Sequence, residues 1–166
     1  SVNRTPTVKK VIFTASTSAL CSDPSEYGQG HVLSEKDWNK TASETYFPYY
    51  YSKTVSELKA FEMCGSQKRW KLCTLLPCIV IGPPLSRHTK SESLTTFKKL
   101  LLGKMFPMVP DFTFYHVDVR DVAAAHCIAM SKEEVEGRCD RPFEVLHDAL
   151  AADHLLLIAV ALRGGE

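Results

Sequence analysis

Two short apolar stretches, both expected to form buried strands, constrain the fold of this chain more than any other feature. The first runs from Val8 to Thr14 and leads into a turn rich in hydroxyl groups. The second runs from Leu72 to Leu76 and leads into a segment that contains three prolines. Between them, Pro48 stands where a helix is expected to begin, because proline is favoured in the first helical turn. This alternation favours an α/β fold.

The expected helix carries a tyrosine and a lysine one turn apart. Tyr49 and Lys53 are four residues apart in the sequence, which places them roughly 6 Å from each other on one helical face. A free phenol titrates near pH 10, and a neighbouring ammonium group favours the phenolate. Tyr49 is therefore a candidate acid–base group tuned by Lys53. A pair at this spacing is also common on ordinary amphipathic helices, and Tyr50 and Tyr51 are competing candidates at shorter spacings.

The candidate pair and the two strand ends are expected to meet. In open α/β sheets, ligands bind at the carboxyl ends of the strands. Ser16 follows the first strand and Pro77 follows the second. We therefore expect Ser16, the helix with Tyr49 and Lys53, and Pro77 to converge on one site.

Local patterns predict the other elements. A helix from Ser93 to about Leu102 is expected to stop at Gly103, because glycine suits the position after a helix. The remaining predictions are a helix from Tyr49 to about Cys64 with Tyr51, Val55 and Leu58 on its core face, a strand at 116–118, and a helix from Arg120 to Met130.

Five blocks of sequence follow one another in the order found in a known family: 8–18 (VKKVIFTASTS), 34–38 (SEKDW), 49–54 (YYYSKT), 76–84 (LPCIVIGPP) and 116–126 (HVDVRDVAAAH). In these blocks the sequence resembles the extended short-chain dehydrogenase/reductase family, also described as the NAD-dependent epimerase/dehydratase superfamily. The branch it resembles most holds dihydroflavonol reductases, cinnamoyl-CoA reductases and 3β-hydroxysteroid dehydrogenases. The resemblance covers roughly residues 8 to 138.

The resemblance implies roles for individual residues. Ser16 would hold the carbonyl or hydroxyl group of the substrate, and Tyr49 would donate or accept the proton. Lys53 would bind the nicotinamide ribose. The implied catalytic residues are thus Ser16, Tyr49 and Lys53, and the implied cofactor contacts are Tyr49, Lys53, Pro77, Val80 and Ser93.

The resemblance also implies a partial fold. Members of the family open with a glycine-rich turn that holds the cofactor pyrophosphate. Here the eight glycines are dispersed, and Gly28-Gln29-Gly30 follows a polar loop. We therefore expect a partial Rossmann-like, doubly wound parallel sheet that corresponds to the C-terminal half of an extended short-chain dehydrogenase. Residues 1–138 would form the catalytic part of an NAD(P)-binding domain, and residues 139–166 a divergent tail that is mainly helical.

Three functions remain open at this stage. The first is an NAD(P)H-dependent oxidoreductase that acts on a carbonyl or secondary alcohol of a small substrate, with NADP(H) favoured over NAD(H). The second is a nucleotide-sugar epimerase or dehydratase, because the same triad serves those reactions in the family. The third is an inactive, truncated chain that makes only protein contacts, and the missing glycine-rich turn motivates it.

Composition excludes several other classes. A formal net charge of +1 with scattered Lys and Arg gives no basis for nucleic-acid binding. The longest apolar run, Leu155 to Leu162, is too short to span a bilayer, and the N-terminus has no apolar signal segment. No two of the six cysteines have C-x-x-C spacing, and we expect reduced thiols and not a disulfide framework or a zinc site. We expect a cytoplasmic protein with a small-molecule substrate, and the apolar tail helix suggests a homodimer contact.

Two further segments have alternative interpretations. The resemblance places the polar segment 21–47 over the substrate, whereas the sequence alone is also explained by a surface connection whose aromatic side chains pack on the following helix. The apolar segment from Met105 to Phe114 is expected to form either a substrate wall or ordinary core packing. His116 and His126 are not assigned to catalysis.

Overall fold

The computed structural model describes residues 1–28, 30–86, 91–105 and 115–139 of the 166-residue chain. The predictions for the apolar segment 106–114 and for the tail 140–166, including its helix and homodimer contact, lie outside the described residues. Within the described residues no helix is both long enough and apolar enough to cross a membrane.

The predicted α/β architecture is confirmed, with all strands parallel to their neighbours. Three strands form one sheet in the order β1-β2-β5. A second parallel pair continues the structure beyond the end of this sheet. The sheet strands are β1 (Lys10–Thr14), β2 (Lys71–Leu75) and β5 (Gly137–Cys139), and the pair is β3 (Ile79–Ile81) with β4 (His116–Asp118).

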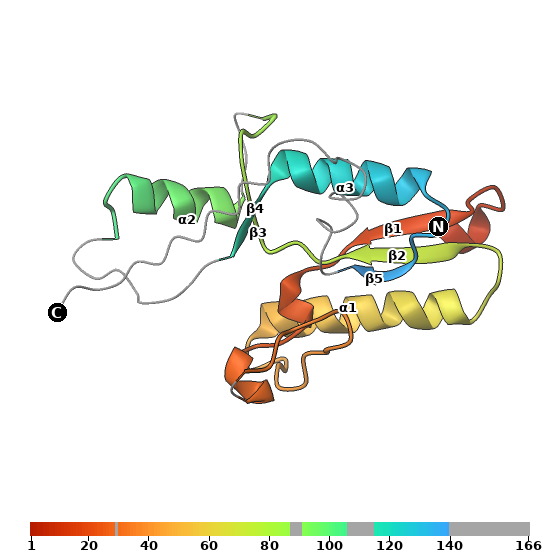
Figure 1. The fold of residues 1–166 in the computed structure, drawn as a ribbon, viewed down its shortest axis with the longest axis horizontal. Helices are drawn as coiled ribbons and strands as arrows, with labels where there is room; N and C mark the ends of the chain where they lie inside the picture. Colours follow the sequence, from red (N-terminus) through yellow and green to blue (C-terminus); the bar gives the residue numbers. More distant parts are fainter. Residues whose placement is uncertain (29, 87–90, 106–114, 140–166) are drawn as a thin grey trace.

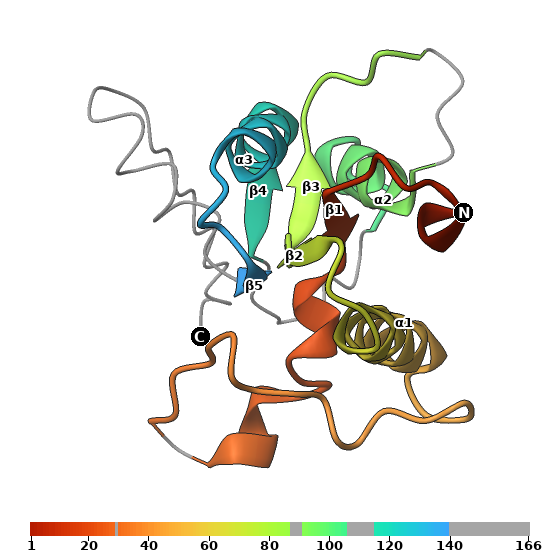
Figure 2. The same cartoon turned by 90° about the vertical axis from the view of Figure 1, so that its right-hand side faces the viewer.

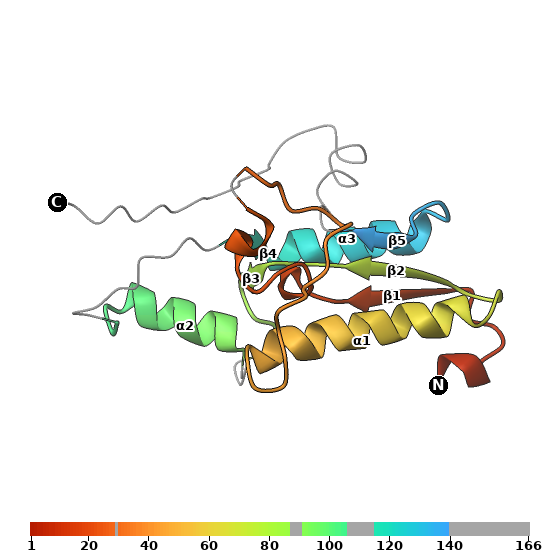
Figure 3. The same ribbon diagram turned by 90° about the horizontal axis from the view of Figure 1, so that it is seen from below.

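Helices cover both faces of the three-stranded sheet. Helix α1 (Pro48–Gly65) lies along one face and α3 (Val119–Ser131) along the other, so the strands form the middle layer (Figure 1). The end-on view shows the same separation of α1 and α3 (Figure 2). Helix α2 (Glu92–Leu101) lies beyond the N-terminal end of α1 and next to β3 (Figure 3). The three short 3-10 helices are η1 (Val2–Arg4), η2 (Thr17–Ala19) and η3 (Pro24–Tyr27).

The core lies between the sheet and its helices. Cys73 and Leu75 of β2 pack against Ala125 and Ala129 of α3, and all four are buried. Alanine side chains let α3 approach the sheet closely, because they occupy little volume at the contact. A second cluster consists of Ala15, Leu20 and Leu76, and it lies directly behind the turn that follows β1.

Most predicted elements are found within one or two residues of their expected bounds. Pro48 is the first residue of α1, as expected from its fixed φ. Gly103, just beyond the end of α2, has a φ of +64°, the left-handed conformation that glycine adopts readily. Strands β3 and β5 were not predicted, whereas β4, which is equally short, was. The unpredicted β5 carries Arg138, which proves central to the packing of the sheet.

The predicted core face of α1 was wrong. Val55 and Leu58 are 43% and 48% exposed, whereas the buried positions of the helix are Thr54 and Glu57. The Thr54 hydroxyl donates to the carbonyl of Tyr50 within the helix at 2.9 Å. Glu57 is buried because partners on the sheet satisfy its carboxylate. The apolar pattern failed here because the helix packs through polar side chains that are paired inside the protein.

Aromatic side chains of the segment 21–47 pack on the helix that follows. Trp38 makes an edge contact with Phe61 of α1, with ring centroids 6.2 Å apart. Phe47 contacts Tyr50 at 5.2 Å. These contacts are those expected of a surface connection, the second of the two interpretations of this segment.

Gly82 yields a prediction about close packing between β3 and α3. Its φ is +143°, and a Cβ atom there would lie 2.6 Å from Cγ1 of Val119. We expect Gly82→Ala to lower the free energy of unfolding by about 1–3 kcal/mol, from backbone strain and this clash. Val119→Ala removes the clashing methyl group, so the double variant should be more stable than the sum of the single changes implies. Urea denaturation of the wild type, the two single variants and the double variant measures these free energies. Strictly additive effects of the two changes would contradict the prediction.

The N-terminus of α3 yields a prediction about pH. The Asp118 carboxylate accepts from the backbone N–H of Arg120 at 2.8 Å and pairs with its guanidinium at 2.7 Å. These hydrogen bonds lower the pKa of Asp118 to about 2. Asp in an unfolded chain has a pKa of about 3.9, so this stabilisation is present above about pH 4 and is lost as the pH falls towards 2.

We therefore expect the free energy of unfolding of the wild type to fall between pH 4 and 2 more steeply than that of Asp118→Asn. Asparagine still caps a helix but carries no charge. Glu62→Gln, which removes a negative charge from an exposed ion pair on α1, is the control for net charge. Equal slopes for the wild type and Asp118→Asn would contradict this assignment.

Candidate active site

A cleft of about 540 Å³ lies where the sheet strands end. Its walls come from the residues that follow β1, from those that follow β2, from β3, and from the first turns of α1, α2 and α3. This volume lies within the range of roughly 300–1,000 Å³ that is common for small-molecule sites. The location agrees with the general rule that open α/β sheets bind ligands at the carboxyl ends of their strands.

The residues singled out from the sequence are brought together in this cleft. They come from five separate segments of the chain and all contribute to its lining. They are Ser16, Tyr49, Lys53, Pro77, Val80 and Ser93.

Tyr49 and Lys53 occupy neighbouring turns of α1 on the side that faces the cleft. The Lys53 Nζ atom lies 5.7 Å from the centroid of the Tyr49 ring. Tyr49 is 58% exposed, so its phenol is accessible to a ligand and to water. Tyr50 and Tyr51 do not line the cleft. Position on the helix thus distinguishes Tyr49 from its two neighbours.

Ser16 sits at the junction between β1 and η2. Its hydroxyl accepts from the backbone N–H of Ser18 at 3.2 Å and donates to the Ser18 hydroxyl at 3.2 Å. The backbone N–H of Thr17 donates to the carbonyl of Pro77 at 3.2 Å, and that of Ala15 donates to Leu75 at 2.8 Å. These bonds continue the β1–β2 pairing past the strand ends and hold Ser16 beside Pro77.

The segment after β2, β3 itself and the start of α2 also contribute to the cleft wall. Pro77 is buried, while Val80 and Ser93 are half-buried. Ser91 caps α2, since its hydroxyl accepts from the backbone N–H of Leu94 at 3.4 Å. Because three helices begin at the cleft, their N-terminal partial positive charges add to the charge of Lys53 and favour an anionic group there.

Sequence reasoning missed several cleft residues with polar groups, among them Thr14 and Cys78. The Thr14 hydroxyl contacts Nε2 of His126 at 2.8 Å, and Nδ1 of the same ring contacts the carbonyl of Val122 at 2.7 Å. Thr14 lines the cleft directly before Ser16, a position at the strand end that could have marked it. Cys78 also lines the cleft, and burial raises the pKa of its thiol, which disfavours the thiolate.

Comparison with known proteins identifies the family. The model of the NAD dependent epimerase/dehydratase family matches residues 2–140. Cinnamoyl-CoA reductase 1 of Arabidopsis thaliana is 35% identical over 133 residues, which cover 79% of this chain and 38% of that protein.

Two solved structures share the fold. Yeast methylglyoxal/isovaleraldehyde reductase Gre2, complexed with NADPH, is 26% identical with a TM-score of 0.66, covering 79% of this chain and 42% of that one. Vestitone reductase from alfalfa, Medicago sativa, is 28% identical with a TM-score of 0.67, and the match covers 89% of this chain and 49% of that one. This chain thus spans less than half the length of each of these three proteins.

The resemblance to the branch that contains cinnamoyl-CoA reductases is confirmed. A match over residues 2–140 includes all five described strands, all three helices and every residue that lines the cleft. The chain therefore belongs to the NAD dependent epimerase/dehydratase family, also known as the extended short-chain dehydrogenases/reductases.

Proposed function

We propose that this chain carries the catalytic part of an NAD(P)H-dependent reductase that converts a carbonyl group of a small substrate into an alcohol, or runs the reverse reaction. The observation that carries this proposal is that Ser16, Tyr49 and Lys53, from two segments 33 residues apart, line one cleft at the strand ends. A hydroxyl, a phenol and an ammonium group can stabilise the charge that forms on the oxygen of a reduced carbonyl and deliver the proton to it.

Each of the three side chains has one task in this proposal. Reduction of a carbonyl carbon leaves negative charge on the oxygen, which a positioned donor stabilises. The Ser16 hydroxyl turns from Ser18 to donate to this oxygen, and the Tyr49 phenol delivers the proton. Lys53 stabilises the phenolate that remains, and water reaches the exposed Tyr49 to return the proton. The bound nicotinamide supplies the hydride.

The cleft residues fit the nicotinamide end of the cofactor. Pro77 and Val80 offer an apolar surface for a flat ring, while Lys53 and Ser93 offer donors for ribose hydroxyl groups. The sequence has no glycine-rich turn of the kind that holds a pyrophosphate. NADP(H) is favoured over NAD(H) because the similar yeast reductase was solved with NADPH.

Part of the cleft lining is apolar, which favours a substrate with an apolar body. Such a wall binds hydrocarbon or aromatic groups through burial and leaves the carbonyl to the polar end of the cleft. The residues that form it are Ile81, Pro83, Pro84, Leu85 and Val119.

Two alternatives remain. A nucleotide-sugar epimerase or dehydratase would use the same tyrosine and lysine, but the relatives named above are reductases. An inactive chain that makes only protein contacts is the other. This chain spans less than half the length of these relatives, so the possibility that it is inactive is tested directly.

Cofactor binding is the first test. We expect the 166-residue chain to bind NADPH in a calorimetric titration that reaches millimolar concentration, with an affinity weaker than that of complete enzymes because it lacks the glycine-rich turn. NADH titrated under the same conditions measures the preference between the two cofactors. No binding of either cofactor at millimolar concentration would reject the reductase proposal for this chain.

Substitution of Tyr49 is the second test, with NADPH consumption in the presence of methylglyoxal or cinnamoyl-CoA as the readout. Tyr49→Phe should reduce turnover by about 10²–10⁴-fold, the usual contribution of a general acid, and leave NADPH affinity nearly unchanged. Lys53→Ala should lower both the turnover and the affinity for NADPH. Tyr51→Phe, the same change at a residue of α1 that does not line the cleft, is the matched control and should keep wild-type turnover. Normal turnover in Tyr49→Phe would refute the acid–base assignment.

A further inference from the structure

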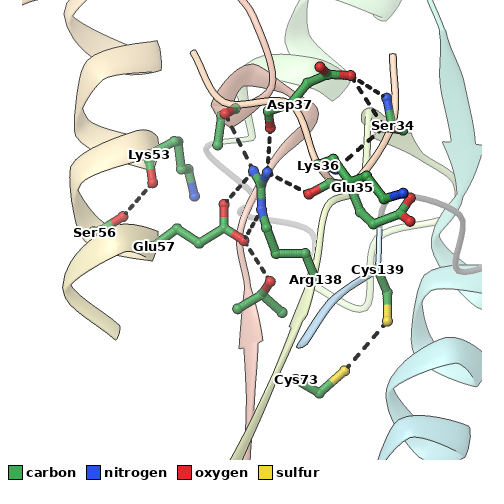
Figure 4. A network of polar contacts seen from close by, with 12 residues as sticks. Ser34, Glu35, Lys36, Asp37, Lys53, Ser56, Glu57, Cys73, Arg138 and Cys139 are labelled. Carbon is green, nitrogen blue, oxygen red and sulfur yellow. Dashed lines mark hydrogen bonds and ion pairs between the residues drawn. The ribbon is translucent and has the colours of Figure 1, made fainter. Parts of the chain in front are cut away.

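The side chain of Arg138 in β5 is buried against α1. Its Nε and Nη2 atoms donate to the two carboxylate oxygens of Glu57, each at 3.0 Å, in a two-pronged ion pair (Figure 4). The Arg138 side chain is 6% exposed and that of Glu57 is 0% exposed. Burying two charges is costly unless every polar atom of the pair finds a partner.

The other N–H groups of Arg138 all reach backbone carbonyls of the segment that follows Ser16. Nη1 donates to the carbonyl of Glu35 at 3.0 Å and to that of Asp37, and Nη2 donates to Ala19 at 3.4 Å. With the two bonds to Glu57, all five donors of the guanidinium are used. The Trp38 ring covers the guanidinium, with its centroid 3.6 Å from Cζ.

On the helix side, this pair fixes the rotation of α1 about its axis. Glu57 lies one turn beyond Lys53 and two turns beyond Tyr49, and Figure 4 shows Lys53 and Glu57 on the same side of the helix. A rotation of about 10° displaces an atom at the outer radius of a helix, roughly 5–6 Å from the axis, by about 1 Å. Glu57 also accepts from the Thr74 hydroxyl of β2 at 2.6 Å, which ties the helix to the central strand.

On the loop side, the pair holds the turn that presents Ser16. Ala19 is the last residue of η2, and Ser16 caps the first turn of the same short helix. The Ala19 carbonyl accepts from Arg138 and from the backbone N–H of Asn39 at 3.0 Å. One guanidinium therefore contacts both the turn that carries Ser16 and the helix that carries Tyr49 and Lys53.

We propose that Arg138 and Glu57 are positioning residues that set the distance between the Ser16 hydroxyl and the Tyr49–Lys53 face of α1. Neither side chain lines the cleft, so both act through the elements they hold. Lysine at position 138 keeps the charge but offers one nitrogen in place of a planar fork, so it cannot hold Glu57 and three carbonyls together. The kinetic consequence of this proposal rests on the proposed function, whereas the placement of the two segments does not.

The kinetic arm compares Arg138→Lys with the wild type, using NADPH and methylglyoxal. A misplacement of about 1 Å reduces catalysis by as much as about 100-fold, so we expect kcat to fall by about 10–100-fold while KM for methylglyoxal changes by less than about threefold. Lys59→Gln, which breaks an exposed ion pair on the same helix, is the matched control and should leave both values unchanged. Wild-type kcat in Arg138→Lys would overturn the proposal.

The second arm measures amide hydrogen exchange of the free chain and does not depend on activity. We expect Arg138→Lys to accelerate exchange in residues 17–20 and 49–57 while β1 and α3 keep wild-type rates. Unchanged exchange in both segments, or an equal acceleration throughout the chain, would overturn the proposal, because the latter indicates a role in global stability alone.

The two arms separate the failure of this proposal from that of the proposed function. If the wild type shows no turnover, the reductase proposal fails for this chain, and the exchange arm alone decides the role of Arg138. If Arg138→Lys does not fold, Glu57→Gln takes its place in both arms. Glutamine keeps the size of the side chain and an oxygen that can accept from Thr74, but it removes the charge that Arg138 pairs with.

Discussion

The buried ion pair between Glu57 and Arg138 is the interaction on which the arrangement of the described structure depends. It joins the first covering helix, α1, to the last strand of the sheet, β5, across 81 positions of sequence. The carboxylate also accepts from Thr74 of β2, and the guanidinium donates to three carbonyls of the connecting segment. Removal of either partner would leave a buried charge without a counter-ion, which is costly. This cost holds α1, β2, β5 and the connecting segment in their relative positions.

The parallel direction of the strands explains why the polar side chains of the cleft lie at one edge of the sheet. Each parallel strand ends at the same side of the sheet, so the turns after β1 and β2 and the first turn of α1 approach one another there. The same geometry directs the N-termini of three helices to the cleft. A site assembled in this way combines hydroxyl groups, an ammonium group and helix partial charges, which together suit an anionic ligand or a developing alkoxide.

Membership of the NAD dependent epimerase/dehydratase family agrees with this geometry. The relatives named above are reductases, which is why we propose a reduction over an epimerisation or dehydration. The chain spans less than half of these relatives. It nevertheless contains a tyrosine, a lysine and a serine on one cleft, together with the buried pair that holds their two segments. The groups that we propose to handle the proton lie within this chain, whereas a glycine-rich turn for the pyrophosphate does not occur in its sequence.

The sequence by itself determined the features that depend on neighbouring residues. Pro48 marked the start of α1, Gly103 marked the end of α2, and the four-residue spacing of Tyr49 and Lys53 placed both on one helical face. The two predicted strand ends, with the rule that open α/β sheets bind ligands there, also predicted that Ser16, the Tyr49–Lys53 helix and Pro77 would meet. Local backbone preferences and helical periodicity act over a few residues, so they can be read without knowing the fold.

Only the tertiary structure decided which side of α1 is buried and what stabilises it. The apolar pattern indicated Val55 and Leu58, but the fully buried side chain is that of Glu57, because Arg138 and Thr74 satisfy it from other elements. Pairing between residues so distant in sequence leaves no periodic signal in either segment. Strand β5 was also missed, and it pairs with β2, a neighbour that is more than 60 positions away in the sequence.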